Sequence, residues 1–328
     1  MADYKAIRGF TIHTVDGDPS NLVAGQVWYN SSSKKVKGSK LAAAAWASGG
    51  NMSAGDLKHR MCFGTYQASQ ATGGNDVSGS AHGKSEQYDG TSWSEVADLN
   101  TNRSYGGNAG VTTAGICFGG LDHPGAAVSV SEEWDGSSWA EGDNLNATKY
   151  YAGSGGTQTA AMMVGGLPGR TSEFETYNGT SWTEEDHGLT NARTQCGGWG
   201  ITTSALMAGG SPNVVDAETY DGSSWTEISN LNTGRSIDAS SKNTGGVGTD
   251  GIAIAGDGST PHMNITEQYN GSTWSEVADV PASFQGGCGF GTGSNAVAQI
   301  ANTPPNTYVN TTAEWTGEYM AAVTFTSS

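Results

Sequence analysis

The stretch Glu86-Gln87-Tyr88-Asp89-Gly90-Thr91-Ser92-Trp93-Ser94-Glu95 decides the fold, because its pattern returns four more times along the chain. Each copy holds an aromatic residue, Asp-Gly or Asn-Gly, two Ser or Thr residues, Trp, any residue, and Glu. The five tryptophans lie 43 to 49 residues apart and are Trp93, Trp139, Trp182, Trp225 and Trp274. This interval is the period of a β-propeller blade rather than of a helical repeat.

The Asp-Gly or Asn-Gly pair of each copy lies between two short runs of β-prone residues. Glycine, asparagine and aspartate tolerate positive φ, which both central residues of a type I′ turn require. We therefore predict a tight two-residue hairpin in each copy, with Tyr88 on the incoming strand and Trp93 on the outgoing strand of the first. The rings are expected to pack in the core between neighbouring sheets.

The residues upstream of each hairpin repeat as well. A basic residue precedes a Gly-rich strand, a Thr-rich turn, a short apolar strand and a double glycine. The spacing from basic residue to double glycine is the same in three copies, which are Arg103 with Gly119-Gly120, Lys149 with Gly165-Gly166 and Arg193 with Gly209-Gly210. Each unit therefore contains enough strands for one small sheet.

The double glycine, the Tyr and the Trp, in this order and at this spacing, resemble the kelch repeat. That resemblance runs from about Arg60 to Trp274, roughly four-fifths of the chain with its partial end units, and it implies an all-β, kelch-like β-propeller of four-stranded blades. Six apolar-strand modules predict six blades. Seven is the alternative, if the residues before position 46 add a partial sheet.

The ends of the chain depart from the repeat. The segment beginning at Trp46 looks like the outgoing Trp strand of a preceding unit, and we expect it to close the ring by joining the C-terminal blade. Tyr319 to Phe325 is the expected last strand of that blade. The predicted organisation is a short N-terminal β attachment segment over residues 1–45, followed by the propeller over residues 46–328.

The charge of the chain is strongly acidic and unevenly distributed. The net charge is −17, yet residues 1–60 hold eight Lys or Arg against four Asp or Glu. An acidic propeller repels phosphates, which argues against nucleic acid as a partner. The basic start, including Lys34, Lys35, Lys37 and Lys40, is either a solvated hairpin or a contact for an acidic protein surface. No apolar run is long enough for a membrane span, so no membrane insertion is expected.

The four cysteines, Cys62, Cys117, Cys196 and Cys288, show neither metal-like pairing nor a disulfide framework. We expect four small buried hydrophobic side chains in a chain made in a reducing cytoplasm. The N-terminal residues lack the apolar core of a signal peptide, which agrees with that expectation.

No catalytic constellation emerges from the sequence. Kelch folds include the copper radical oxidases, which need a Tyr/His copper cluster, but the six histidines here have no paired spacing. Nucleophile elbows, phosphate loops and His-Glu-x-x-His motifs are missing. The chain is therefore predicted to be no enzyme and to bind no cofactor or metal.

A repeated carboxylate follows each of the five tryptophans by two residues. These residues are Glu95, Glu141, Glu184, Glu227 and Glu276, and a basic residue such as Arg103 recurs eight or nine positions after the first four. Five symmetric active sites are implausible, so we interpret the pattern as structural ion pairs between blades.

Functional variation is expected where the repeat breaks its own pattern, in the loop after the double glycine. Antiparallel strand order places these loops on the same face as the blade-to-blade connections, a face that commonly binds partners in kelch proteins. Trp199, which replaces small residues at equivalent positions, is expected to line the central funnel. The candidate binding residues are His82, Lys84, Asp122, His123, Arg170, Asn213, His262 and Trp199.

The N-terminal segment carries a second resemblance. Gly25-Gln26-Val27-Trp28-Tyr29-Asn30 is similar to a strand-turn motif of bacteriophage tail-fibre and virion proteins, where it often precedes Trp-x-x-Gly-Gly-Asn, as in Trp46 to Asn51 here. Kelch-like propellers with such turns also resemble those of phages that infect marine bacteria. The resemblance implies a virion component that is made in the bacterial cytoplasm and assembled on the particle.

These observations lead to three hypotheses. The first is a non-catalytic virion protein, tail-fibre or tail-associated, which contacts other virion proteins through residues 1–45 and presents a propeller face to host surface glycans. The second is a propeller that decorates the capsid or tail without a receptor role. The third is a polysaccharide-degrading enzyme, which would need two carboxylates facing one cleft.

Overall fold

The computed structural model describes residues 12–237, 239–242, 250–258, 262–305 and 307–325. All regular elements among them are β-strands, and the chain separates into two compact units. Trp46–Trp315 form one unit, called the propeller here. Met1–Ala45 and Thr316–Ser328 form the other, called the small unit.

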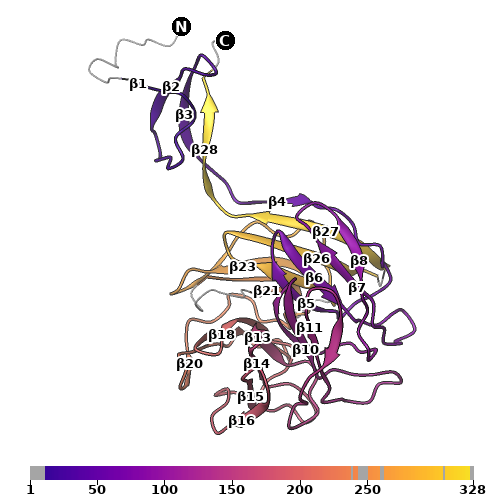
Figure 1. Ribbon diagram of the computed structural model, residues 1–328. Helices are drawn as coiled ribbons and strands as arrows, with labels where there is room; N and C mark the ends of the chain where they lie inside the picture. The colour runs from indigo at the N-terminus through magenta and orange to yellow at the C-terminus, as the bar shows by residue number, and fades with distance from the viewer. Residues whose placement is uncertain (1–11, 238, 243–249, 259–261, 306, 326–328) are drawn as a thin grey trace. The chain divides into compact units, whose positions relative to one another are not determined.

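Four of the propeller's blades are consecutive four-stranded antiparallel meanders. Each blade takes its strands in chain order, with the first strand innermost (Figure 1). Blade 1 has β5 (Met61–Thr65), β6 (Ala68–Thr72), β7 (Ser85–Tyr88) and β8 (Trp93–Val96). Blade 2 has β9 (Gly107–Val111), β10 (Ala114–Phe118), β11 (Ser131–Trp134) and β12 (Trp139–Glu141). Blade 3 has β13 (Gly153–Thr157), β14 (Ala160–Val164), β15 (Phe174–Tyr177) and β16 (Trp182–Glu185). Blade 4 has β17 (Gly197–Ile201), β18 (Ser204–Ala208), β19 (Ala217–Tyr220) and β20 (Trp225–Glu227).

The last two blades are joined by their innermost strands. Blade 5 has β21 (Ala239–Lys242), β22 (Gly251–Gly256), β23 (Met263–Tyr269) and β24 (Trp274–Glu276). Blade 6 has β25 (Cys288–Gly291), β26 (Asn295–Thr303), β27 (Thr307–Thr316) and, from the other end of the chain, β4 (Ala45–Ser48). A short parallel pairing of β21 with β25 joins the two sheets. Six blades and the closure of the ring by the Trp46 strand are thus confirmed.

The small unit is one four-stranded sheet of the order β1-β2-β3-β28 (Figure 1). Its strands are β1 (His13–Val15), β2 (Val27–Asn30), β3 (Lys35–Ala42) and β28 (Tyr319–Thr324). The prediction that Tyr319 to Phe325 completes the last blade is therefore wrong, because β28 pairs along its whole length with β3. β4 already occupies the outer edge of blade 6, and the expected propeller range of 46–328 is too long at its C-terminal end.

The repeated aromatic rings form the core between blades, as predicted. Within each hairpin the aromatic residue and the Trp lie opposite each other, with ring centroids 5.1 Å apart for Tyr177 and Trp182. Each Trp also reaches back to the preceding blade, as Trp182 does to Phe118 at 4.6 Å. Burial of such large aromatic surfaces is the main favourable term that holds neighbouring blades together.

The hairpin turns differ from the predicted two-residue type I′ turns. Tyr88 is paired with Trp93, so four residues form the loop, and only Gly90 in it has positive φ, at 89°. The side chain of Asp89 accepts hydrogen bonds from the backbone N–H groups of Thr91 and Ser92, at 2.9 and 2.8 Å. This side-chain cap stabilises a longer turn, in which Asp89 need not enter the left-handed region.

The glycine content reflects close backbone approach in the innermost hairpins. At Gly156, φ is +111°, and an added Cβ would lie 2.2 Å from the carbonyl oxygen of Ala160. The same arrangement recurs at the equivalent glycine of four other blades, at Gly64, Gly110, Gly200 and Gly291. Only glycine combines this φ with this approach, so the repeat retains it.

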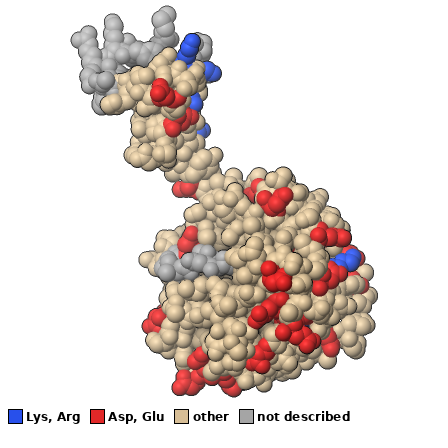
Figure 2. Space-filling model, in the orientation of Figure 1, with Lys and Arg blue, Asp and Glu red and all other residues tan. Residues whose placement is uncertain are grey.

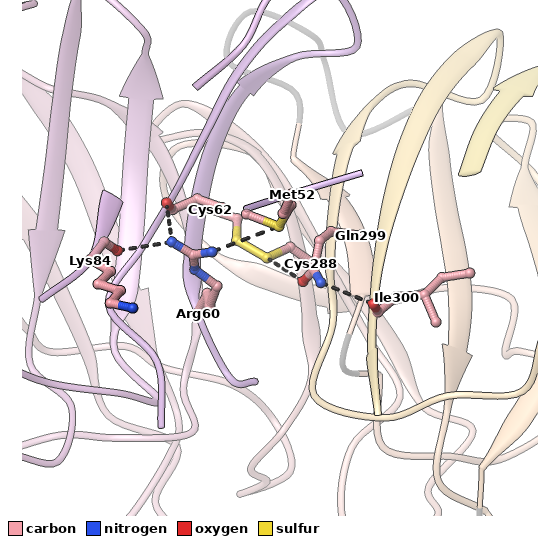
Figure 3. Close-up of a disulfide and its surroundings, with 8 residues drawn as sticks. Met52, Arg60, Cys62, Lys84, Cys288, Gln299 and Ile300 are labelled. Carbon is pink, nitrogen blue, oxygen red and sulfur yellow. Dashed lines mark hydrogen bonds between the residues drawn. A yellow bond between two sulfur atoms is a disulfide. The ribbon is translucent and has the colours of Figure 1, made fainter. Parts of the chain in front are cut away.

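Two of the cysteines form a disulfide, which corrects the expectation of four reduced side chains. Cys62 of β5 is bonded to Cys288 of β25, across 226 residues of sequence (Figure 3). Cys117 and Cys196 are buried thiols. The spacing in sequence could not reveal the pair, because the first and the last innermost strands become neighbours only when the ring closes.

The prediction of ion pairs between blades chose the wrong glutamates. Arg235 lies 2.5 Å from Glu267, and Arg193 lies 2.8 Å from Glu218, with all four side chains buried. These glutamates precede the Tyr by two residues. The glutamates after the Trp, such as Glu276, are exposed on the outermost strands. Strand pairing explains the error, since Glu276 lies opposite Glu267, but one strand farther from the axis.

The inner glutamates also cap the blade-to-blade connections. Glu132 accepts hydrogen bonds from the backbone N–H groups of Asn100 and Thr101, at 2.7 and 3.1 Å, and lies 3.3 Å from Arg103. Burial of both charges is tolerated because the carboxylate is also hydrogen-bonded to backbone. The pairs therefore position the connections that lead into the channel.

Candidate functional site

The candidate loops lie on the face that also carries the blade-to-blade connections. In blade 1, His82 donates its backbone N–H to Gly74, while Leu99 of the connection donates to Gly83. The expected shared face is therefore present. The loop residues are distributed around it, one group per blade, rather than gathered in a single cleft.

Half of the candidate side chains are exposed, and several help to shape their own loops. His82 Nε2 lies 3.0 Å from Asp76 Oδ2, and Asp122 Oδ1 accepts the backbone N–H of Ala126 at 2.8 Å. Lys84 borders a cavity of about 400 Å³ beside acidic residues that include Glu95. The remaining loop candidates are His123, Arg170 and Asn213, which are exposed, and His262, which is half-buried.

The expected place of Trp199 in the central funnel is wrong. Its side chain is 2 % exposed and packs against Trp274, with ring centroids 5.8 Å apart. In β17 it lies opposite Leu206, on the sheet face that blade 5 covers. Trp199 therefore belongs to the core between blades 4 and 5.

The structure brings a different set of residues together where the connections enter the innermost strands. We call this set the channel mouth, and it has one residue from each blade: His59, Tyr105, Tyr151, Gln195, Ile237 and Gly286. The first five donate their backbone N–H groups to the carbonyl oxygen of the residue before them around the ring, beginning with His59 to Gly286 at 2.6 Å and ending with Ile237 to Gln195 at 2.9 Å. Five consecutive hydrogen bonds thus link the six blades around the axis.

The ring of hydrogen bonds requires an unusual backbone. His59, Tyr105, Tyr151 and Gln195 have φ between 55° and 61°, in the left-handed region. Bulky residues seldom adopt it, and such strained residues often mark functional sites. The repeat explains this strain structurally, since each connection must turn sharply into its innermost strand. The same turn places the side chains over the channel.

Three of these side chains form a continuous aromatic cluster. The centroids of His59 and Tyr105 are 4.2 Å apart with nearly parallel planes, and those of Tyr105 and Tyr151 are 4.4 Å apart. Together with Gln195 and Ile237 they line a cavity of about 90 Å³. The disulfide of Cys62 and Cys288 lies in the wall of the same cavity, with Arg60 beside it (Figure 3).

The imidazole of His59 is held neutral. Burial lowers its pKa to about 3, despite a hydrogen bond to Asn75 that acts in the opposite direction. His59 Nδ1 lies 3.0 Å from Asn75 Oδ1, while Asn75 Nδ2 donates to the Asp76 carbonyl at 3.4 Å. Because the amide oxygen only accepts, Nδ1 carries the proton and Nε2 is an acceptor.

Our sequence reasoning missed the channel mouth, although a signal was present. Tyr105, Tyr151, Gln195 and Ile237 each follow the repeated basic residue by two positions, so they form a variable column within a regular repeat. His59 could not be aligned in this way, because the basic residue of its blade, Arg60, stands three positions later in the repeat than the basic residues of the other blades. Arg60 therefore follows His59 instead of preceding it by two positions, although it still reaches its carbonyl partners.

The residues that the structure describes contain no group of three or more His, Cys, Asp or Glu side chains placed to hold a metal ion. A helix with the length and apolarity to cross a bilayer is likewise not found among them.

Comparisons with known proteins support the fold. No protein-family model matches the chain, and no curated protein sequence matches it either. Among solved structures, that of YjhT is similar, with a TM-score of 0.66 over 83 % of this chain and 99 % of YjhT, at 9 % sequence identity. A likeness at this identity establishes the β-propeller fold alone.

Proposed function

We propose that this protein is a non-catalytic bacteriophage virion protein that attaches through its small unit and presents the propeller for recognition of host-surface glycans. The observation that carries the proposal is the uneven distribution of exposed apolar side chains. Of nine large hydrophobic side chains exposed among the described residues, seven lie in the small unit. An exposed apolar surface on the small sheet suits contact with another protein, whereas the polar surface of the propeller suits contact with solvent and polar ligands.

Several apolar side chains of the small unit share one side of its sheet, together with Lys40, whereas Leu41 lies on the other side. Register places Tyr29 opposite Val36 and Val323 opposite Gly38, and residues that are paired in this way share a face. We call this set the apolar face; it comprises Val27, Tyr29, Val36, Tyr319, Val323 and Phe325. Tyr319 and Phe325 are 53 % and 57 % exposed. A single sheet stabilises such a face by packing it against another layer, so it is suited to contact with another virion protein.

Charge supports a division between attachment and recognition. Acidic side chains are scattered over the propeller surface that Figure 2 shows, where few basic ones are visible, whereas the strand β3 of the small unit carries Lys35, Lys37 and Lys40. Lys37 pairs with Asp18 at 2.7 Å, and Asp18 also accepts from Trp28 and Asn30. The phage-like motif therefore forms an ordered strand, in which Trp28 and Asn30 are buried.

The virion part of the proposal rests on the resemblance of residues 25–30 and of the repeat to phage proteins. Immunogold labelling of particles from the source, with antibody against the propeller, tests it directly. Label at tail tips or fibres supports attachment to the host. Label over the head favours a decorating protein without a receptor role, and no label on any particle refutes the virion assignment.

A single substitution on the apolar face tests the role of the small unit in attachment. Deleting residues 1–45 would also remove the partner of β28, so we prefer Tyr319→Lys in the full-length chain, supplied in trans to infected cells. We expect the variant to be lost from purified particles. Val77→Lys is the matched control, because Val77 is 73 % exposed but lies in a propeller loop, and its incorporation should be unchanged.

A further inference from the structure

We propose that the channel mouth binds one neutral pyranose ring, the terminal residue of a glycan. This inference rests on the recognition part of the proposed function and names the site and the ligand class for it. It moves the recognition surface from the long loops to the residues His59, Tyr105, Tyr151 and Gln195.

The aromatic cluster provides a face for a sugar ring. Tyr105 stacks on His59 and contacts Tyr151, so three rings from three successive blades form one continuous surface. Aromatic faces carry negative charge density and attract the weakly positive C–H groups along one face of a pyranose. The left-handed backbone, tied by the ring of hydrogen bonds, holds these side chains in place before any ligand arrives. A preorganised surface loses less entropy when it binds.

Hydrogen-bonding groups lie next to the aromatic surface. His59 Nε2 is an acceptor, since Asn75 holds the proton on Nδ1. The ring packs closely against the backbone of Gly286, where an added Cβ would lie 2.9 Å from Nε2, so a side chain at this position of blade 6 would collide with the imidazole. A sugar hydroxyl is a donor to which Nε2 is complementary, while the amide of Gln195 can both donate and accept.

The charge of the cavity favours a neutral ligand. Among the described residues that line it, Arg60 is the one with a charged side chain, and it is directed away into the blade. Its guanidinium donates to the carbonyl oxygens of Ala71 and Lys84, both at 2.9 Å (Figure 3). No lining cation is left to bind a carboxylate or phosphate, and the acidic surroundings disfavour an anion.

The size of the cavity restricts the ligand to the end of a chain. Its volume is about 90 Å³. Pockets that enclose drug-sized ligands typically have about 300–1,000 Å³. The cavity is thus too small to enclose a glycan, so a single terminal ring would rest on the aromatic cluster partly enclosed, and the rest of the glycan would extend into solvent. Weak binding of single residues becomes useful when many copies act together on one particle.

Saturation-transfer NMR on the purified full-length protein tests the proposal. The probes are neutral hexoses, N-acetylhexosamines and deoxyhexoses, with glucuronic acid as the acidic comparator. We expect at least one neutral sugar to give a transfer signal with the wild type. Its affinity should be about tenfold lower for Tyr105→Asn, as expected for the loss of a stacking contact. Asparagine tolerates positive φ, so this variant should keep the hydrogen-bond ring. Tyr105→Phe, which retains the aromatic ring, should keep most of the affinity.

Tyr66→Asn is the matched control. Tyr66 is an exposed tyrosine in the turn between β5 and β6, at the opposite end of β5 from His59, and its substitution should leave binding unchanged. The proposal is overturned if no neutral sugar gives a signal, if Tyr105→Asn binds like the wild type, or if glucuronic acid binds as tightly. Particle labelling separates this result from the virion role, since a protein that labels particles but binds no sugar retains that role.

Discussion

Cys62 and Cys288 are bonded through their sulfur atoms and thereby join β5 and β25, the innermost strands of the first and the last blade. The same two ends of the ring are closed a second time, when β4 pairs with β27 at the outer edge of blade 6. The propeller is therefore closed at the channel by a covalent bond and at the periphery by strand pairing.

The disulfide is expected to stabilise the propeller, because it reduces the number of conformations that a very long segment of the unfolded chain can adopt. Replacing both residues, Cys62→Ser with Cys288→Ser, should lower the free energy of unfolding by about 2–4 kcal/mol in chemical denaturation. A reductant should destabilise the wild type and leave the double variant unaffected. Equal denaturation midpoints for the wild type with and without reductant would show that the bond contributes nothing.

The buried pair of Arg235 and Glu267 should be essential, whereas the neighbouring Glu276 should not. Glu267→Gln leaves the Arg235 guanidinium buried without its charge partner and is expected to cost about 3–5 kcal/mol of unfolding free energy. Glu276→Gln, directly opposite on the exposed outer strand, should change it by less than about 0.5 kcal/mol. Similar losses for the two variants would contradict the assignment of the ion pair to the inner glutamate.

The hairpin aspartates should make the fold sensitive to acid. Hydrogen bonds from the Ser138 backbone and from the side chain and backbone of Ser137 lower the pKa of Asp135 to about 2. An unfolded aspartate has a pKa of about 3.9, so ionised Asp135 favours the folded state. Its contribution is complete above that value and is lost as the pH falls through the folded pKa.

Substitution by asparagine tests this pH dependence. Asn178 occupies the equivalent position in blade 3 and accepts the backbone N–H groups of Thr180 and Ser181, both at 2.9 Å. Asp135→Asn should therefore keep the turn and remove its titration. Denaturation midpoints measured between pH 5 and pH 2 should fall less steeply in the variant, and an identical slope would rule out Asp135 as a contributor.

Two glycines with nearly the same φ separate the cost of a steric clash from the cost of backbone strain. Gly156 and Gly125 have φ of +111° and +112°, but an added Cβ meets the Ala160 carbonyl oxygen at 2.2 Å in the first and nothing within 4 Å in the second. Both alanine variants are strained by the left-handed φ, at about 1 kcal/mol or more. Gly156→Ala should lower the melting temperature clearly further. Equal shifts would mean that the innermost hairpin relaxes around the new methyl group.

Much of the propeller could be predicted, because its residues act locally and repeat. The spacing of Trp93, Trp139 and their equivalents led to the propeller, since each hairpin must bury its aromatic ring against the blade beside it, and the six apolar-strand modules led to six blades. The four-residue turn at Asp89 escaped prediction, because the side-chain cap on the backbone competes with a tighter turn of the same sequence. Cross-strand neighbours such as Glu267 and Glu276 could not be told apart, since both follow the same repeat.

The sequence by itself determined the repeated blade, its aromatic core and the use of the Trp46 strand to close the ring, because period, turn residues and strand alternation are properties of short segments. Only the tertiary structure decided which residues meet across the ring. The bond between Cys62 and Cys288, the pairing of β28 with β3 and the aromatic channel mouth all join segments that are distant along the chain. The disulfide and the channel mouth arise when six blades are arranged around one axis, and the β28–β3 pairing arises when the two ends of the chain meet in the small unit, so no local pattern sets their geometry.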